Sequence, residues 1–180
     1  MRTFVAVEIS DKKITDAISE FQSNIGINAR AVNSNNLHFT LQFLGEVSDD
    51  ESNKIKDALT KIEFSEFVVN FQGVGAFPKL KFPRVIWIGT DNEGGKALVE
   101  LAKKIENALV PLGFTNDKPF KPHVTIFRIK NKIGDITKEM GKFENVDFGS
   151  QKITNFKFKQ SILTPSGPIY SDLEEVKSKS

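Results

Sequence analysis

The sequence contains no cysteine and only two histidines among its 180 residues. The missing cysteines exclude disulfide bonds, thiolate nucleophiles and cysteine-based zinc sites. Two histidines are too few for a histidine-rich metal site, and no clustered acidic motif suggests a carboxylate site. We therefore expect neither a metal ion nor another cofactor. Any acid–base chemistry at histidine has to use His38 and His123.

Long apolar runs are also missing. No stretch approaches the roughly 20 apolar residues that cross a bilayer. The apolar run that begins at Phe4 is too short for a signal peptide because Glu8 interrupts it. These features predict a cytoplasmic protein with no membrane partner, and we expect a monomer.

Tyrosine and tryptophan occur once each, against 16 phenylalanines. We expect the phenylalanine rings to form the core, and the alternative for one or two of them is exposure for stacking on a base. The net charge of +2 is mildly basic, so the position of the charges matters more than their sum.

Residue periodicity predicts one α+β domain over 1–180 that mixes strands and helices without strict alternation. Ser48 and Glu51 form a capping box that begins the second helix. We expect the segment 73–83, rich in Gly, Pro and Lys, to be an exposed loop, and the polar tail 176–180 to be frayed. The predicted strands cover 2–9, 37–44, 66–72, 84–90, 123–129, 144–149, 152–163 and 168–173. The first helix covers about 12–26, the second follows the capping box with its apolar face through Ile62, and the third runs from Asp91 or Asn92 to about 109.

The two histidines occur in matching motifs, Leu37-His-Phe-Thr-Leu41 and Pro122-His-Val-Thr-Ile126. Side chains alternate along a strand, so each histidine shares a face with the threonine two residues later. Each motif follows a strand and a helix, and this echo indicates an internal duplication with two similar lobes. If the two strands are neighbours, one surface holds two imidazoles and two hydroxyls.

Such a surface suits phosphodiester chemistry without a metal ion. One imidazole can accept a proton from a nucleophile while the other protonates the leaving oxygen. The hydroxyls of Thr40 and Thr125 can donate hydrogen bonds to the non-bridging phosphate oxygens. A single His-x-Thr motif usually has only a structural role, but two matched copies favour catalysis by His38 and His123.

Strand alternation also assigns the neighbouring residues. It places Phe39, Leu41 and Phe43 in the core, and Gln42 and Phe127 on the face of the histidines. Gln42 is then a candidate substrate contact and Phe127 a candidate pocket wall or stacking ring. A structural role remains the alternative for both.

The chain resembles the two-histidine phosphoesterase superfamily, and within it the LigT-type RNA 2′,3′-cyclic phosphodiesterases, also called 2′-5′ RNA ligases. The resemblance covers nearly the whole chain. It rests on Arg2-Thr-Phe-Val-Ala-Val7, Asn36-Leu-His-Phe-Thr-Leu-Gln-Phe-Leu-Gly45, Pro83-Arg-Val-Ile-Trp-Ile-Gly89, Lys121-Pro-His-Val-Thr-Ile-Phe-Arg128 and the last hairpin.

The resemblance implies two pseudo-symmetric α+β lobes around a concave antiparallel sheet, with helices outside and the motifs on central strands. It implies opening of terminal 2′,3′-cyclic phosphates on RNA to 2′-phosphates. His38 would be the proton donor and His123 the proton acceptor, while Thr40 and Thr125 hold the phosphate. It also places Arg128 near the phosphate, although strict alternation puts Arg128 on the core face unless a bulge or the strand end re-aims it.

Basic residues are grouped near both motifs and would attract an RNA backbone if they face one groove. They are Lys79, Lys81, Arg84, Lys118, Lys121, Arg128, Lys130 and Lys132. Two alternatives to the phosphodiesterase remain open. One is a ligase that joins RNA ends, such as tRNA halves, through 2′-5′ linkages, and the other is a non-catalytic RNA-binding module.

Overall fold

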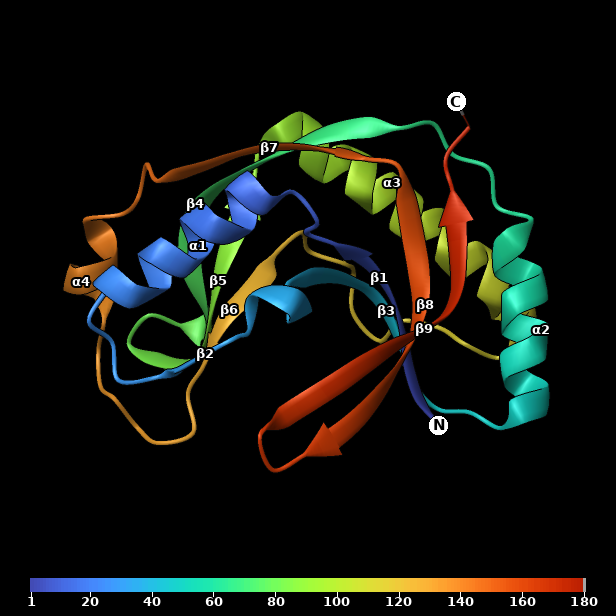
Figure 1. Ribbon diagram of the computed structural model, residues 1–180, viewed down its shortest axis with the longest axis horizontal. Coiled ribbons are helices and arrows are strands. Elements are labelled where there is room, and N and C mark those ends of the chain that lie inside the picture. The colour runs from blue at the N-terminus through green and yellow to red at the C-terminus, as the bar shows by residue number, and fades with distance from the viewer. Residues whose placement is uncertain (180) are drawn as a thin grey trace.

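The computed structural model describes residues 1–179 as two antiparallel sheets with helices on their outer sides (Figure 1). The elements in chain order are β1 (Arg2–Glu8), α1 (Lys12–Asn24), β2 (Arg30–Ala31), the 3-10 helix η1 (Ser34–Asn36), β3 (His38–Glu46), α2 (Asp49–Thr60), β4 (Phe67–Lys79), β5 (Phe82–Thr90), α3 (Asn92–Leu109), η2 (Val110–Leu112), β6 (Val124–Arg128), α4 (Thr137–Gly141), β7 (Asp147–Ile153), β8 (Asn155–Thr164) and β9 (Gly167–Lys177).

The sheet topology repeats, as the internal echo of the sequence predicts. The first sheet has the order β3-β1-β8-β9, and the second has the order β2-β6-β5-β4-β7. In each sheet a motif strand pairs antiparallel with the strand that precedes it across a helix: β3 with β1, and β6 with β5. The α+β class and the two pseudo-symmetric lobes are confirmed.

The motif strands lie near sheet edges rather than at sheet centres. β3 is the edge strand of the first sheet, and only the two-residue β2 lies beyond β6 in the second. The two strands are nevertheless in contact, so the edges of the two sheets meet at the motifs. The two sheets are therefore joined by the contact between β3 and β6 and do not form one continuous sheet.

The helices cover the sheets and share one apolar core with them. In Figure 1, α1 and α4 lie at one end of the molecule and α2 at the other. Helix α3 contacts β4 of the second sheet and β3 of the first, so it bridges the lobes. The amphipathic face of α3 buries Leu98, Leu101 and Ile105 in this shared cluster. At the start of α2, Ser48 and Glu51 make the reciprocal backbone hydrogen bonds of a capping box.

Two regions differ from the sequence expectations. The segment 73–83 is not a loop, because β4 and β5 continue through it as a hairpin that turns at Leu80 and Lys81. The tail is not frayed up to Lys179, because β9 extends to Lys177 and the Lys179 amide donates to the Phe64 carbonyl at 2.9 Å. Ser180 lies outside the described residues.

No helix among residues 1–179 combines the length and apolarity that a membrane crossing requires.

Candidate active site

The two His-x-Thr motifs meet in one cavity. His38 opens β3, and His123 directly precedes β6. Both histidines line a cavity of about 510 Å³ together with Thr40 and Thr125. The four side chains that strand alternation groups in pairs therefore share one surface.

Each imidazole is oriented by a backbone carbonyl two residues earlier. His38 Nδ1 lies 2.7 Å from the Asn36 oxygen, and His123 Nδ1 lies 2.6 Å from the Lys121 oxygen. A carbonyl oxygen only accepts hydrogen bonds, so Nδ1 is the protonated nitrogen in each ring. The Nε2 atom of each ring then keeps its lone pair for proton exchange. His38 Nε2 lies 3.0 Å from the hydroxyl oxygen of Thr40, which donates to it.

Aromatic rings pack against both histidines. The His38 ring centroid lies 5.1 Å from that of Phe4 and 5.3 Å from that of Tyr170. The His123 ring lies edge-on to Phe77, with centroids 4.9 Å apart, and its centroid is 6.3 Å from that of Trp87. These rings fix the imidazole planes and exclude water from one side of each.

This packing changes the acid–base properties of the pair. Burial lowers the pKa of His38 to about 4, and the charges of Lys159 and Arg128 act in the same direction against the Asn36 carbonyl. Burial also lowers the pKa of His123, and its backbone hydrogen bond to Lys121 opposes the shift. In the protein alone both imidazoles are neutral near pH 7, and negative charge placed between them would raise both pKa values.

A β-bulge follows each motif at the same position. In the β1–β3 pair, Val5 lies opposite Gln42 and Ala6 opposite Thr40, so Leu41 is an extra residue. In the β5–β6 pair, Ile86 lies opposite Phe127 and Trp87 opposite Thr125, so Ile126 is the extra residue. Each bulge lies three residues after its histidine and reverses the alternation beyond that point.

Because of the bulge in β3, two side chains lie on the faces opposite to those that strict alternation predicts. Phe43 is not in the core; it is 54% exposed. Gln42, placed by strict alternation on the histidine face, is only 2% exposed, and both polar atoms of its amide are buried without a hydrogen-bond partner among the described residues. Gln42 is therefore largely buried, and it lines a neighbouring cavity rather than the cavity of the histidines. Its contact with substrate stays a prediction.

The bulge in β6 has the matching effect. Phe127 is 2% exposed and belongs to the core, so it is neither a pocket wall nor a stacking ring. Arg128 is exposed and lines the cavity of the histidines. The bulge turns the Arg128 side chain from the core face, where strict alternation would place it, to the face of the histidines.

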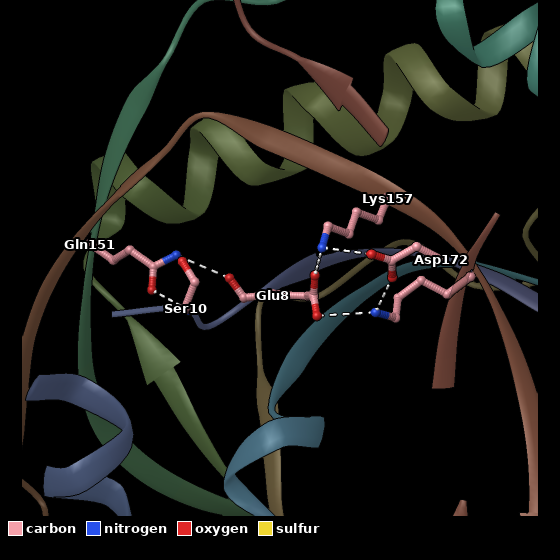
Figure 2. Close-up of polar contacts among 6 residues, drawn as sticks. Glu8, Ser10, Gln151, Lys157 and Asp172 are labelled. Atoms are coloured by element: carbon pink, nitrogen blue, oxygen red, sulfur yellow. Dashed lines mark hydrogen bonds and ion pairs between the residues drawn. The ribbon is translucent and has the colours of Figure 1, made fainter. Parts of the chain in front are cut away.

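A ring of alternating charges lies beside His38 in the first sheet (Figure 2). Glu8, which pairs across the strands with His38, accepts from Lys157 at 2.6 Å and from Lys159 at 3.0 Å. Asp172 accepts from the same two lysines at 2.9 and 2.7 Å. Burial opposes ionisation of Glu8 and Asp172, but the hydrogen bonds from the lysines outweigh it and lower the pKa of both carboxyls.

The β8–β9 hairpin and β2 each supply a cavity residue that the sequence did not predict. Tyr170 lines the cavity, and so does Arg30 of β2. The Arg30 guanidinium donates to the Ser166 carbonyl, and the Asn36 side chain donates to the Pro168 carbonyl at 3.2 Å, so the hairpin tip is tied to β2 and η1. The one signal in the sequence is that Tyr170 is the single tyrosine; nothing local marks Arg30.

Among residues 1–179, no three His, Cys, Asp or Glu side chains lie together as a metal ion would require. The groups that converge on the cavity include two neutral imidazoles, the hydroxyls of Thr40 and Thr125, and two guanidiniums. They can exchange protons and can bind the oxygens of an anion.

Comparison with known proteins adds a family to this geometry. The family described as the AKAP7 2′5′ RNA ligase-like domain matches residues 2–177. The RNA 2′,3′-cyclic phosphodiesterase of Archaeoglobus fulgidus is 42% identical over 176 residues, covering 96% of this chain and 98% of that protein. The protein of the same name from Aeropyrum pernix is 37% identical over 161 residues, covering 88% of this chain and 91% of its own.

The fold is also similar to that of a solved structure. The crystal structure of E. coli LigT in complex with 3′-AMP superposes with a TM-score of 0.82 at 23% identity and covers 99% of this chain and 98% of that chain.

Proposed function

The chain belongs to the family of AKAP7 2′5′ RNA ligase-like domains, and on that premise we propose that it is an RNA 2′,3′-cyclic phosphodiesterase. It is a hydrolase that opens terminal 2′,3′-cyclic phosphates on RNA to 2′-phosphates. The observation that carries the proposal is the matched pair of histidines in one cavity, each with Nδ1 held by a carbonyl and Nε2 left for proton transfer.

The reaction needs one proton acceptor and one proton donor on opposite sides of the phosphorus. His123 Nε2 takes a proton from water as the water oxygen bonds to phosphorus. The bond from phosphorus to O3′ breaks, and protonated His38 gives its proton to O3′, leaving the phosphate on O2′. The division of roles between the two histidines follows the family resemblance. Afterwards His123 loses its proton to solvent and His38 regains one.

Binding of the substrate prepares His38 for its role. With a pKa of about 4, His38 is mostly neutral at neutral pH before the phosphate binds. The negative charge of the cyclic phosphate beside Nε2 favours the imidazolium and raises this pKa. The donor is therefore charged chiefly in the complex, where its proton is needed.

Three cavity side chains are placed to hold the phosphate. The hydroxyls of Thr40 and Thr125 and the guanidinium of Arg128 line the same cavity as the imidazoles. They can bind the non-bridging oxygens, whose charge grows in the transition state. Because these groups supply both proton transfer and charge stabilisation, we propose that catalysis is independent of metal ions.

The test is product analysis with an oligonucleotide that ends in a 2′,3′-cyclic phosphate. We expect a 2′-phosphate end, formed at the same rate with and without a chelator. A 3′-phosphate product would contradict the assigned leaving oxygen, and a rate abolished by chelator and restored by a divalent cation would contradict metal independence.

The same reaction mixtures distinguish the alternative activities. A joined product whose linkage resists a nuclease specific for 3′-5′ bonds would identify 2′-5′ ligation. Binding of the oligonucleotide without any turnover would identify an RNA-binding module. tRNA fragments as substrates, a monomeric state and a cytoplasmic location stay predictions, and sedimentation of the purified protein tests the monomer.

A further inference from the structure

We propose that the RNA strand upstream of the cyclic phosphate leaves the active site along a track that ends at the tip of the β4–β5 hairpin. The inference rests on the proposed function, because it takes an RNA 3′ end to lie between the two histidines. It adds where the rest of the strand binds and which residues make the enzyme prefer longer RNA.

The track is a chain of three cavities that share residues. The active-site cavity shares Thr40 and His123 with a second cavity of about 720 Å³. The second cavity shares Arg84 with a third of about 260 Å³ at the β4–β5 hairpin. A strand whose terminal phosphate contacts His123 therefore enters the second cavity directly and reaches the third past Arg84.

The second cavity has the chemistry of a site for single-stranded nucleic acid. Phe43, Phe77 and Phe120 supply apolar ring surface, and the cations around it are Arg84, Lys118 and Lys121. No aspartate or glutamate is among the described residues that line it. Aromatic rings that stack on bases, together with cations that track the backbone, are what such sites use.

The third cavity continues the same pattern. Phe82 next to the hairpin turn is 55% exposed, and the ammonium groups of Lys79 and Lys132 lie 5.3 and 6.0 Å from its ring centroid. Lys81 lines this cavity as well, and the carboxylate of Asp135 offsets part of its charge. An exposed ring flanked by several lysines suits one stacked base between phosphates.

The active-site cavity is also lined by the β8–β9 hairpin, which contributes no residue to the other two cavities. There the β8–β9 hairpin is tied to β2 and η1 by the hydrogen bonds from Arg30 to Ser166 and from Asn36 to Pro168. On this inference the terminal nucleoside lies against this tied hairpin and the upstream strand lies in the other two cavities.

The two lobes carry different residues at the matched position that follows each bulge. Arg128 lies five residues after His123, and Phe43 lies five residues after His38, so they occupy equivalent positions in the two lobes. Arg128 lines the active-site cavity, whereas Phe43 lines the second cavity. The duplication thus gives one side a cation for the reacting phosphate and the other side a ring for a base.

The experiment compares 2′,3′-cyclic AMP with cyclic-phosphate oligonucleotides of two to six residues. For the unmodified protein KM should fall as length increases. Phe82→Ser and Lys132→Gln lie outside the active-site cavity. Each should raise KM for the hexanucleotide by about 5- to 10-fold, corresponding to one lost stacking or phosphate contact, and change turnover of 2′,3′-cyclic AMP by less than about twofold.

Matched variants separate the track from general charge and folding effects. Lys54→Gln removes an exposed lysine from α2, at the other end of the molecule, and should leave KM for every length unchanged. Phe82→Leu keeps apolar bulk but loses stacking, so it should resemble Phe82→Ser. Binding of an uncleavable hexanucleotide should lose about 0.7 from the slope of log affinity against log salt in Lys132→Gln.

The outcomes distinguish this inference from the proposed function. Hydrolysis of 2′,3′-cyclic AMP with a KM that does not depend on RNA length would overturn the track and leave the phosphodiesterase intact. Variants that slow only the joining of a second RNA strand would also overturn it, because the second cavity would then hold an acceptor. No hydrolysis at any length would count against the proposed function, and the binding measurement would still decide the track.

Discussion

His38 and His123 make the same contact with a backbone carbonyl, so their surroundings are what separates them. His38 lies among Phe4, Tyr170 and the cations of Lys159 and Arg128, and its pKa is about 4. The pKa of His123 is lowered by burial, and no neighbouring cation contributes to the shift. A site that lowers both pKa values before substrate binds depends on the charge of the substrate to create its acid.

This dependence predicts different pH profiles for the two kinetic constants. The profile of kcat/KM reports the free enzyme, and that of kcat reports the complex. Because the phosphate raises the pKa values of the histidines, the optimum of kcat should lie at higher pH than the optimum of kcat/KM. Initial rates on 2′,3′-cyclic AMP between about pH 4 and pH 9 measure both, and the limbs belong to the coupled pair. Coincident optima would contradict the account.

The same burial predicts a pH-dependent stability. The pKa of His38 falls from 6.5 to about 4 on folding, so the folded state binds fewer protons between these values. Above pH 6.5 His38 is neutral in both states, and its contribution to the free energy of unfolding is fully present. As pH falls toward 4 the unfolded state binds the proton more readily, so this contribution is lost. In His38→Gln this contribution is absent, and the gap in unfolding free energy between variant and wild type should change by up to ~3 kcal/mol from pH 7 to pH 4. Urea denaturation at both pH values checks it, and a constant gap would contradict it.

At the scale of single elements, the sequence predicts the motif strands correctly only as far as the threonines. Period-two alternation places His38 with Thr40, and the cavity confirms that placement. Beyond Leu41 and Ile126 it fails, because each extra residue turns the following side chains to the opposite face. A bulge depends on pairing with the neighbouring strand, so neither motif contains a local signal for it. For this reason strict alternation places Phe127 on the wrong face of its strand.

The β4–β5 hairpin shows a different limit of sequence reasoning. Its Gly, Pro and Lys residues are typical of loops, yet Gly75 lies in a strand, and the ring of Trp87 on the neighbouring strand packs across it. A Cβ at Gly75 would lie 2.2 Å from a ring carbon of Trp87. The glycine is needed for close approach of a side chain, which only the paired structure reveals.

Gly75→Ala tests this element. The added methyl group forces the Trp87 ring to move, and this ring packs near His123. We expect a loss of about 1–3 kcal/mol in stability and a fall in kcat/KM on the order of 10-fold from misplacement of the imidazole. Gly141→Ala is the control, since a Cβ there meets no atom within 4 Å. Thermal unfolding and steady-state kinetics would show the two variants behaving alike if the packing is unimportant.

At the scale of the whole molecule, the site exists because two sheet edges meet. The α+β class and the duplication could be predicted from the repeated strand–helix–motif order. The contact between β3 and β6 could not, because it is made by the shared core and by α3, which packs on strands of both sheets. The closed ring of Glu8, Lys157, Lys159 and Asp172 also joins β1 to the β8–β9 hairpin, which is distant from β1 in sequence (Figure 2).

Removal of Lys159 from this ring should affect both stability and catalysis. Lys159 is 5% exposed and bonds to both carboxylates. Lys159→Met should cost roughly 1–3 kcal/mol, because each carboxylate loses a hydrogen-bond donor. It should also raise the pKa of His38, since the charge of Lys159 lowers it, and so shift the limb of kcat/KM that reports His38 to higher pH. Lys157→Met is the matched variant, because Lys157 pairs with the same two carboxylates. Unfolding and pH–rate measurements on both variants separate the effect on stability from the effect on the pKa of His38.

The central claim is that His38 and His123 together open the cyclic phosphate. The most direct measurement is kcat on a 2′,3′-cyclic-phosphate oligonucleotide for His38→Ala and His123→Ala, each shown to be folded by circular dichroism. The account predicts that each substitution lowers kcat by about 100-fold or more, through loss of the acid or the base. Turnover close to that of the wild type in either folded variant would contradict it.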